Sequence, residues 1–125
     1  MAKKVFIVED EAALLYALEA KLRLEGFNVE VAVDGEEAIK KLKNYKPDLV
    51  ILDIILPKID GWEVLQNIRA NSNLVKVPVV IVTNLTDKHS REKGVELGAD
   101  NFLVKSDFDL EELVKKIKEV FNKEK

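Results

Sequence analysis

Short runs of apolar residues, rich in valine and isoleucine, recur along the chain and alternate with segments that have helical periodicity. Four of these runs are apolar almost throughout, which is typical of strands buried on both faces of a parallel sheet. They cover residues 4–8, 48–52, 77–83 and 101–105. A fifth run, residues 28–33, alternates between polar and apolar positions, and this pattern predicts a strand at the edge of the sheet.

The segments between the runs place apolar residues three or four positions apart, as amphipathic helices do. These stripes predict helices over residues 11–25 with a stop at Gly26, around residues 38–42 before Pro47, after Gly61, and after a cap at Asp107 or Asp109. Residues 85–98 also suit a helix, but the central turns of this segment are nearly all polar and it contains Gly94. We expect that helix to pack weakly.

Strand and helix therefore alternate five times. This order predicts an α/β fold with a five-stranded parallel sheet and helices on both faces, because parallel strands need crossover connections. A chain of 125 residues can bury one substantial core, so we expect a single domain over residues 1–125.

Composition narrows the class of protein. With 47% hydrophobic and 34% charged residues, the chain has the balance of a folded globular protein. It has no cysteine and no apolar run near the roughly 20 residues of a membrane span, so we expect a cytoplasmic protein without membrane insertion. A net charge of -3 argues against direct binding of nucleic acid, which needs clustered basic charge.

Charged and hydroxyl side chains close several of the predicted strands. Glu9 and Asp10 follow the first run, Asp53 follows the third, and the last two runs end in Thr83 and Lys105. If the first and third strands are neighbours where the strand order reverses, three carboxylates meet in one cleft. Mg²⁺ relieves such repulsion and also takes phosphate oxygens. A carboxylate beside the metal can then accept a phosphoryl group as an aspartyl phosphate.

Four motifs stand in order at these strand ends. They are VEDE, ILDIILPKIDG around Asp53, VTN around Thr83, and GADNFLVK running into Lys105. With them the chain resembles a response regulator receiver domain of two-component signalling over its whole length. The resemblance implies a flavodoxin-like, doubly wound sheet with strand order 2-1-3-4-5.

The same resemblance implies roles for individual residues. Asp53 would accept a phosphoryl group from a histidine kinase or a histidine phosphotransfer protein. Glu9, Asp10 and Asp53 would bind Mg²⁺ together with the backbone carbonyl of Ile55. The domain would then act as a switch, and it would catalyse only its own phosphorylation and dephosphorylation.

The resemblance also implies how the signal leaves the site. Thr83 and Lys105 would contact the phosphoryl group, and Phe102 would be the switch aromatic that reorients when Thr83 moves. The surface of the fourth helix, fifth strand and fifth helix would regulate an unknown downstream protein. Because the chain ends soon after its last helix, we expect output by docking rather than through an attached domain, unless it is a piece of a longer protein.

Several positions depart from the family pattern. Ser106 follows Lys105 where the family has a proline after a cis bond, and a cis bond before a non-proline residue costs about 3 kcal/mol, so we expect trans. Asn84 stands where the family has a small residue. Ile55 and Leu85 are apolar at positions that border the hydrolytic water, and neither can orient it. This predicts slow self-dephosphorylation.

Simpler interpretations stay open at this point. Acids that follow a strand can be charges favoured by a helix N-terminus, and we place Glu11 in that class, outside the site. Phe102 can be a core residue, and His89 is expected in solvent. As a whole, the chain could be a phosphorylation-independent interaction module with the receiver fold, for which Ser106 and Asn84 would be early signs. An aspartyl phosphatase or a flavin-binding module fits these residues less well.

Overall fold

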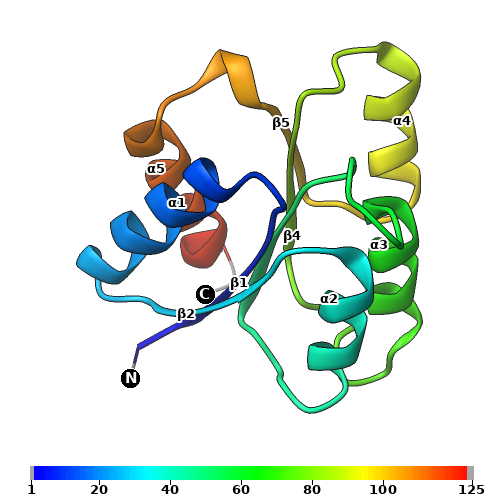
Figure 1. The fold of residues 1–125 in the computed structure, drawn as a ribbon, viewed down its shortest axis with the longest axis horizontal. Helices are drawn as coiled ribbons and strands as arrows, with labels where there is room; N and C mark the ends of the chain where they lie inside the picture. Colours follow the sequence, from blue (N-terminus) through cyan, green and yellow to red (C-terminus); the bar gives the residue numbers. More distant parts are fainter. Residues whose placement is uncertain (1, 124–125) are drawn as a thin grey trace.

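Five parallel strands form one sheet in the order β2-β1-β3-β4-β5 (Figure 1). The computed structural model describes residues 2–123. The strands are β1 (Lys4–Val8), β2 (Asn28–Ala32), β3 (Leu49–Leu52), β4 (Val79–Thr83) and β5 (Asn101–Val104). The predicted α/β class, the parallel sheet and the strand order are confirmed, and β2 is an edge strand as expected.

Helices cover both faces of the sheet. They are α1 (Ala12–Leu24), α2 (Gly35–Leu42), α3 (Gly61–Ala70), α4 (Lys88–Glu96) and α5 (Leu110–Lys123), with a short 3-10 helix η1 (Lys105–Asp107) before α5. Figure 1 shows α1 and α5 on one side of the sheet and α2, α3 and α4 on the other. Within residues 2–123, no helix combines the length and apolar character needed to cross a bilayer.

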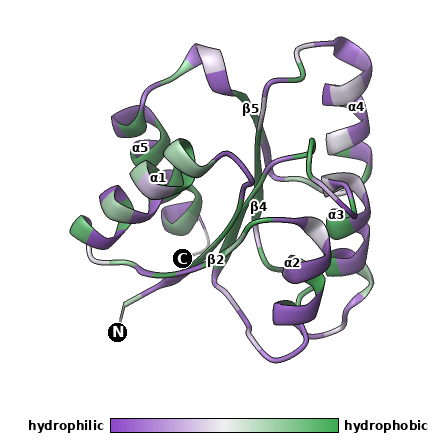
Figure 2. Ribbon diagram, in the orientation of Figure 1, coloured by the Kyte–Doolittle hydropathy of each residue, from purple (hydrophilic) through white to green (hydrophobic). Residues whose placement is uncertain are grey.

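Two apolar layers hold the sheet between these helices. Along β1, Val5 and Ile7 pack into the layer under α1 and α5, whereas Phe6 and Val8 pack into the layer under α2 and α3. All four are fully buried, and burying a side chain of this size stabilises the fold by about 1.5–3 kcal/mol. The double coverage explains why the central strands are apolar throughout, and Figure 2 shows the polar positions on the outer helical faces.

Aspartate side chains begin four of the helices. Asp34, Asp60 and Asp87 each accept a hydrogen bond from the backbone N–H three residues later, which satisfies a free donor of the first turn. At α5 the N–H of Glu112 donates to Asp109 Oδ1 at 2.9 Å, and the N–H of Asp109 donates back to the Glu112 carboxylate. The predicted cap of α5 is therefore Asp109.

Strand ends differ slightly from the prediction. β5 ends at Val104, so Lys105 is the first residue of η1 and not the last residue of the strand. β4 begins at Val79 rather than at Val77, because Pro78 has no N–H to donate to the sheet. Residues 2–123 contain no cis peptide bond, so the bond before Ser106 is trans as expected.

Helix α4 contributes little to the core, in agreement with its polar sequence. Its only buried residues are Ser90 and Gly94, and Val95 is 70% exposed. Figure 2 shows this helix as mostly hydrophilic. A Cβ atom at Gly94 would lie 3.1 Å from a ring carbon of Phe102 and 3.2 Å from Cδ1 of Ile81. The glycine thus lets α4 approach β4 and β5 closely, a role that its sequence position did not reveal.

Candidate functional site

Glu9 and Asp53 come together because β1 and β3 are neighbours in the sheet. The N–H of Asp53 donates to the carbonyl of Val8 at 3.0 Å, and the N–H of Glu9 donates to the carbonyl of Ala32 at 3.0 Å. Each residue is thus held by a backbone hydrogen bond just beyond its own strand. Glu9 is 2% exposed and Asp53 is 4% exposed.

Asp10 completes a cluster of three acids. One carboxylate oxygen each from Glu9, Asp10 and Asp53 lies within 4.8 Å of the other two, and Asp10 is exposed while the others are buried. Oxygens on opposite sides of one Mg²⁺ ion lie about 4.2 Å apart. At most one pair of the three oxygens can take opposite positions, and adjacent oxygens on Mg²⁺ lie about 3 Å apart, so the three side chains would move inward to share an ion. The all-oxygen donor set fits Mg²⁺.

Lys105 places one ammonium group between the two buried acids. Its Nζ lies 2.8 Å from Oδ2 of Asp53 and 2.9 Å from Oε1 of Glu9, and its side chain is 11% exposed. A charge-assisted contact of this kind is stronger than an exposed ion pair, because little water competes with it. The position of Lys105 at the start of η1, just after β5, aims its side chain at the ends of β1 and β3.

Burial and charge shift two pKa values in the site. Burial raises the pKa of Glu9 above 4.5, although Lys105 and the N–H of Glu11 act in the opposite direction. For Lys105, burial alone would lower the pKa, but the hydrogen bonds to Asp53 and Glu9 outweigh burial and raise the pKa above 10.5. Lys105 therefore remains a cation at neutral pH, whereas Glu9 accepts a proton more readily than an exposed glutamate does.

The loop after Asp53 fixes the backbone around that carboxylate. The N–H of Ile55 donates to Asp53 Oδ1 at 3.2 Å, and the N–H of Gly61 donates to the carbonyl of Ile54 at 2.8 Å. A Cβ atom at Gly61 would lie 2.2 Å from the carbonyl oxygen of Asp53, so only glycine fits there. The side chain of Ile55 points away from the core and is 56% exposed.

Thr83 and Phe102 lie on neighbouring strands, β4 and β5, in different surroundings. Thr83 is fully buried as the last residue of β4, and its hydroxyl accepts a long, 3.5 Å hydrogen bond from the N–H of Leu85. Phe102 is half-buried on β5, where its ring contacts Gly94 of α4, and the guanidinium of Arg91 lies 5.2 Å from the ring centroid. Phe102 is thus positioned under α4 rather than among the carboxylates.

Glu11 lies closer to the site than the sequence suggested. Its N–H donates to Oε2 of Glu9 at 3.0 Å, and its own carboxylate lies 3.5 Å from Nζ of Lys105. The expectation that Glu11 is only a helix N-terminal charge is therefore incomplete. Its place beside Glu9 and Asp10 was a signal, but an acid before a helix is too common to assign on that ground.

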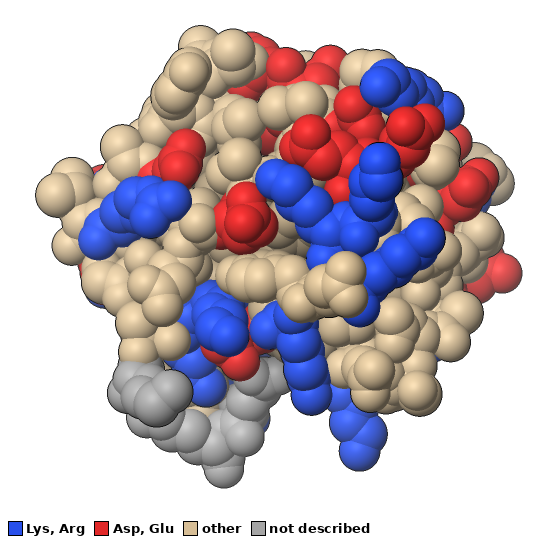
Figure 3. Space-filling model, turned by 60° about the horizontal axis from the view of Figure 1, so that its bottom comes forward, with Lys and Arg blue, Asp and Glu red and all other residues tan. Residues whose placement is uncertain are grey.

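One face of the molecule carries charged side chains of both signs. Figure 3 shows that face, where Lys and Arg side chains spread over the middle and lower part with acidic residues among them. A groove elsewhere on the surface is lined by Lys46 and Lys76 together with Asp48, Ser72 and Asn73. Because charges of both signs share this face, it does not by itself indicate a partner, and the expected absence of nucleic acid binding stays a prediction.

Comparison with known proteins identifies the family of this chain. The family model described as the response regulator receiver domain matches residues 5–118. Among curated proteins, the probable transcriptional regulator ycf27 of Guillardia theta is 44% identical over 121 residues, which are 97% of this chain and 46% of the relative. This chain spans about half the length of the curated relatives it matches.

Two solved structures are similar over nearly the whole chain. A CheY-like response regulator receiver domain protein from Methanospirillum hungatei has a TM-score of 0.89 at 27% identity, with 98% of this chain and 96% of that chain covered. The receiver domain of the sensor histidine kinase PA1611 from Pseudomonas aeruginosa has a TM-score of 0.85 at 28% identity, with 95% and 97% covered. That structure holds a magnesium ion coordinated in its active site cleft.

Proposed function

The chain belongs to the response regulator receiver domain family, and from this premise we propose that it works by accepting a phosphoryl group on Asp53. The observation that carries the proposal is the place of the Asp53 carboxylate. It is almost withdrawn from solvent, has two further acids beside it, and contacts one lysine cation. A carboxylate held in this way is a positioned nucleophile, and phosphoryl transfer depends mainly on positioning and charge neutralisation.

The proposed donor is a phosphorylated histidine of a kinase or of a histidine phosphotransfer protein. A carboxylate oxygen of Asp53 forms the new bond to phosphorus, and the phosphorus–nitrogen bond breaks with its electron pair returning to the imidazole. Glu9, Asp10, Asp53 and the carbonyl of Ile55 would hold Mg²⁺. The ion supplies positive charge to the phosphoryl oxygens during transfer.

Lys105 and Thr83 would contact the phosphoryl group after its transfer to Asp53. Lys105 exchanges its contact with the free Asp53 carboxylate for a contact with a phosphoryl oxygen, and the Thr83 hydroxyl, now only weakly bonded, donates to another. Movement of Thr83 then changes the space available to Phe102. Because α4 buries only Ser90 and Gly94, a small free energy suffices to shift it, and the α4-β5-α5 face changes.

The domain also has proposed partners, a proposed location and a proposed lifetime of its phosphorylated state. We assign residues 1–125 to a single receiver domain in the cytoplasm, which receives its signal from a kinase and acts on a downstream protein of unknown identity. Ile55 and Leu85 present apolar side chains where the hydrolytic water would approach Asp53, and we therefore propose slow self-dephosphorylation.

Intact mass measurement tests the central claim. The chain is incubated with acetyl phosphate, with Mg²⁺ or with a chelator, and the expected result is a Mg²⁺-dependent gain of one phosphoryl group by the wild type. Asp53→Asn should gain none. Asp107→Asn is the matched control, because Asp107 is an exposed aspartate near the same end of the fold, and it should behave as the wild type. No gain by the wild type would favour a phosphorylation-independent interaction module.

A further inference from the structure

The edge strand β2 turns one row of backbone groups away from the sheet. The N–H of Asn28 and the carbonyl of Ala32 pair with the β1 side, at 2.9 and 3.0 Å. In a parallel pair the backbone groups of alternate residues face alternate sides, so residues 29, 31 and 33 face outward. An edge of this kind is a template for the addition of another strand unless side chains cover it.

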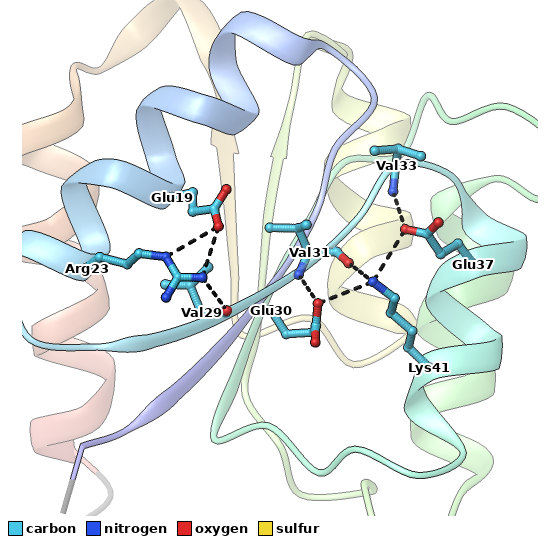
Figure 4. Close-up of polar contacts among 8 residues, drawn as sticks. All are labelled: Glu19, Arg23, Val29, Glu30, Val31, Val33, Glu37 and Lys41. Atoms are coloured by element: carbon cyan, nitrogen blue, oxygen red, sulfur yellow. Dashed lines mark hydrogen bonds and ion pairs between the residues drawn. The ribbon is translucent and has the colours of Figure 1, made fainter.

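Helix α1 covers the first part of this edge. The outward carbonyl of Val29 accepts a hydrogen bond from Nη2 of Arg23 at 3.0 Å. The same guanidinium nitrogen lies 3.0 Å from the carboxylate of Glu19, one turn earlier on α1. Figure 4 shows the arginine lying between the glutamate and the strand. The ion pair thus holds the guanidinium against the strand.

Helix α2 and the strand itself cover the rest. The outward N–H of Val31 donates to Oε1 of Glu30 at 3.0 Å, and the outward carbonyl of Val31 accepts from Nζ of Lys41 at 2.6 Å. The N–H of Val33 donates to the Glu37 carboxylate at 3.1 Å, and Lys41 lies between both glutamates. Figure 4 shows this chain of contacts running along the strand. Four successive outward groups, from Val29 O to Val33 N, therefore have charged partners.

The other edge of the sheet is treated differently. Along β5, in the part of the chain that the structure describes, Arg91 reaches the carbonyl of Phe102 only at 3.5 Å. A groove lined by Phe102 and Leu103, among others, remains open beside that strand. The covering of β2 is thus a feature of one edge and not a general property of the surface.

We propose that Arg23, Glu30, Glu37 and Lys41 form a cap that closes a strand-addition surface, and that the occupant of the opened surface is β2 of a second copy. Two-fold symmetry makes such pairing antiparallel, and an axis at Val31 sets Val29 of one copy opposite Val33 of the other. The three residues whose backbone groups face outward are valines, a residue type that favours strands. Exposed ion pairs are individually weak, so the cap is a barrier that substitution can remove.

One variant removes the cap without changing the net charge. Arg23→Met, Glu30→Thr, Glu37→Ala and Lys41→Met together delete two cations and two anions. The matched control deletes two exposed helical ion pairs elsewhere, through Lys88→Met, Glu92→Ala, Lys116→Met and Glu119→Ala. Light scattering on unphosphorylated protein should show a concentration-dependent shift of the cap variant from one chain to two, and no such shift for the control.

Amide hydrogen exchange identifies the surface that pairs. In the cap-variant dimer the N–H groups of Val29, Val31 and Val33 should become more slowly exchanging as concentration rises. A cap variant that stays folded and monomeric, or a dimer that protects another surface, overturns the proposal. If the cap variant does not fold, amide hydrogen exchange of the wild type tests the cap instead. Fully unprotected exchange at Val31 and Val33 would show that the glutamates do not cap them.

Discussion

The ammonium nitrogen of Lys105 lies 2.8 Å from Oδ2 of Asp53, and both side chains are nearly withdrawn from solvent. This contact links η1 to the end of β3, and a second contact of the same nitrogen links it to Glu9 at the end of β1. In a buried group of charges, removal of one partner leaves the others uncompensated. The contact therefore affects both the stability of the fold and the state of the candidate nucleophile.

Replacement of Lys105 by methionine should destabilise the protein by about 3 kcal/mol in the presence of a chelator, because two buried carboxylates lose their cation. Saturating Mg²⁺ should recover part of this loss, since the ion binds the same acids in the folded state. Urea unfolding with and without Mg²⁺ measures both effects. Lys115→Met, at an exposed position on α5, is the control and should change stability little. If Lys105→Met lost the same stability with and without Mg²⁺, the ion would not bind the acids that Lys105 contacts.

Glu9 should make stability and Mg²⁺ binding depend on pH. Its pKa in the folded protein is raised above 4.5, mainly by burial, so the folded chain binds a proton more readily than the unfolded chain. Stability from Glu9 is then fully present below pH 4.5 and is lost as the pH rises through the raised value. Mg²⁺ needs the carboxylate, so its affinity should rise over the same interval. Fluorescence of the single tryptophan during Mg²⁺ titration should show this slope in the wild type and a smaller one in Glu9→Gln.

Arg69 should anchor the far end of α4. From α3, its guanidinium donates to the carbonyl of Gly98 just after α4 at 2.7 Å, and to the carbonyls of Val75 and Val77 before β4. Removal of the guanidinium leaves two partly buried carbonyls, those of Val77 and Gly98, unpaired, so Arg69→Met should cost about 2 kcal/mol in urea unfolding. Arg91→Met, at an exposed arginine, should cost clearly less. If Arg69→Met and Arg91→Met cost the same, the hydrogen bonds from Arg69 to the carbonyls add no stability beyond that of an exposed arginine.

The sequence predicted the sheet, and it singled out most residues of the candidate site, for a physical reason. Strands buried on both faces leave long apolar runs, so the acids and the lysine that follow those runs stand out at the strand ends. Glu9, Asp10, Asp53 and Lys105 were found in this way, and the structure brings them together. The strand order came from the family resemblance, because apolar runs alone do not fix which strands are neighbours.

Other features depend on contacts between distant segments and leave no local pattern. Arg69 resembles any helix-surface arginine in the sequence, and its carbonyl partners come from two separate loops. Gly94 looked like a helix weakness, but its meaning depends on the ring of Phe102 from β5. Glu11 was set aside because a helix dipole favours acids at that position, and only the fold shows its carboxylate near Lys105. Side-chain contacts between distant elements were therefore the least predictable part of the structure.

The exposed side chain of Ile55 should control how long the phosphorylated state lasts. Its N–H contacts the Asp53 carboxylate, so its side chain borders the approach of water, which an apolar group cannot orient. Ile55→Asn should speed dephosphorylation on the order of tenfold, less than the 10²–10⁴-fold of full general acid–base catalysis. Val75→Asn is the matched control, because Val75 is also an exposed β-branched aliphatic residue, at 44%, but it precedes β4 and so lies at the other end of the strands. The decay of phosphorylated protein, followed by intact mass, measures the rates. A wild-type lifetime of seconds, or equal decay in Ile55→Asn, would exclude Ile55 as the cause of slow hydrolysis.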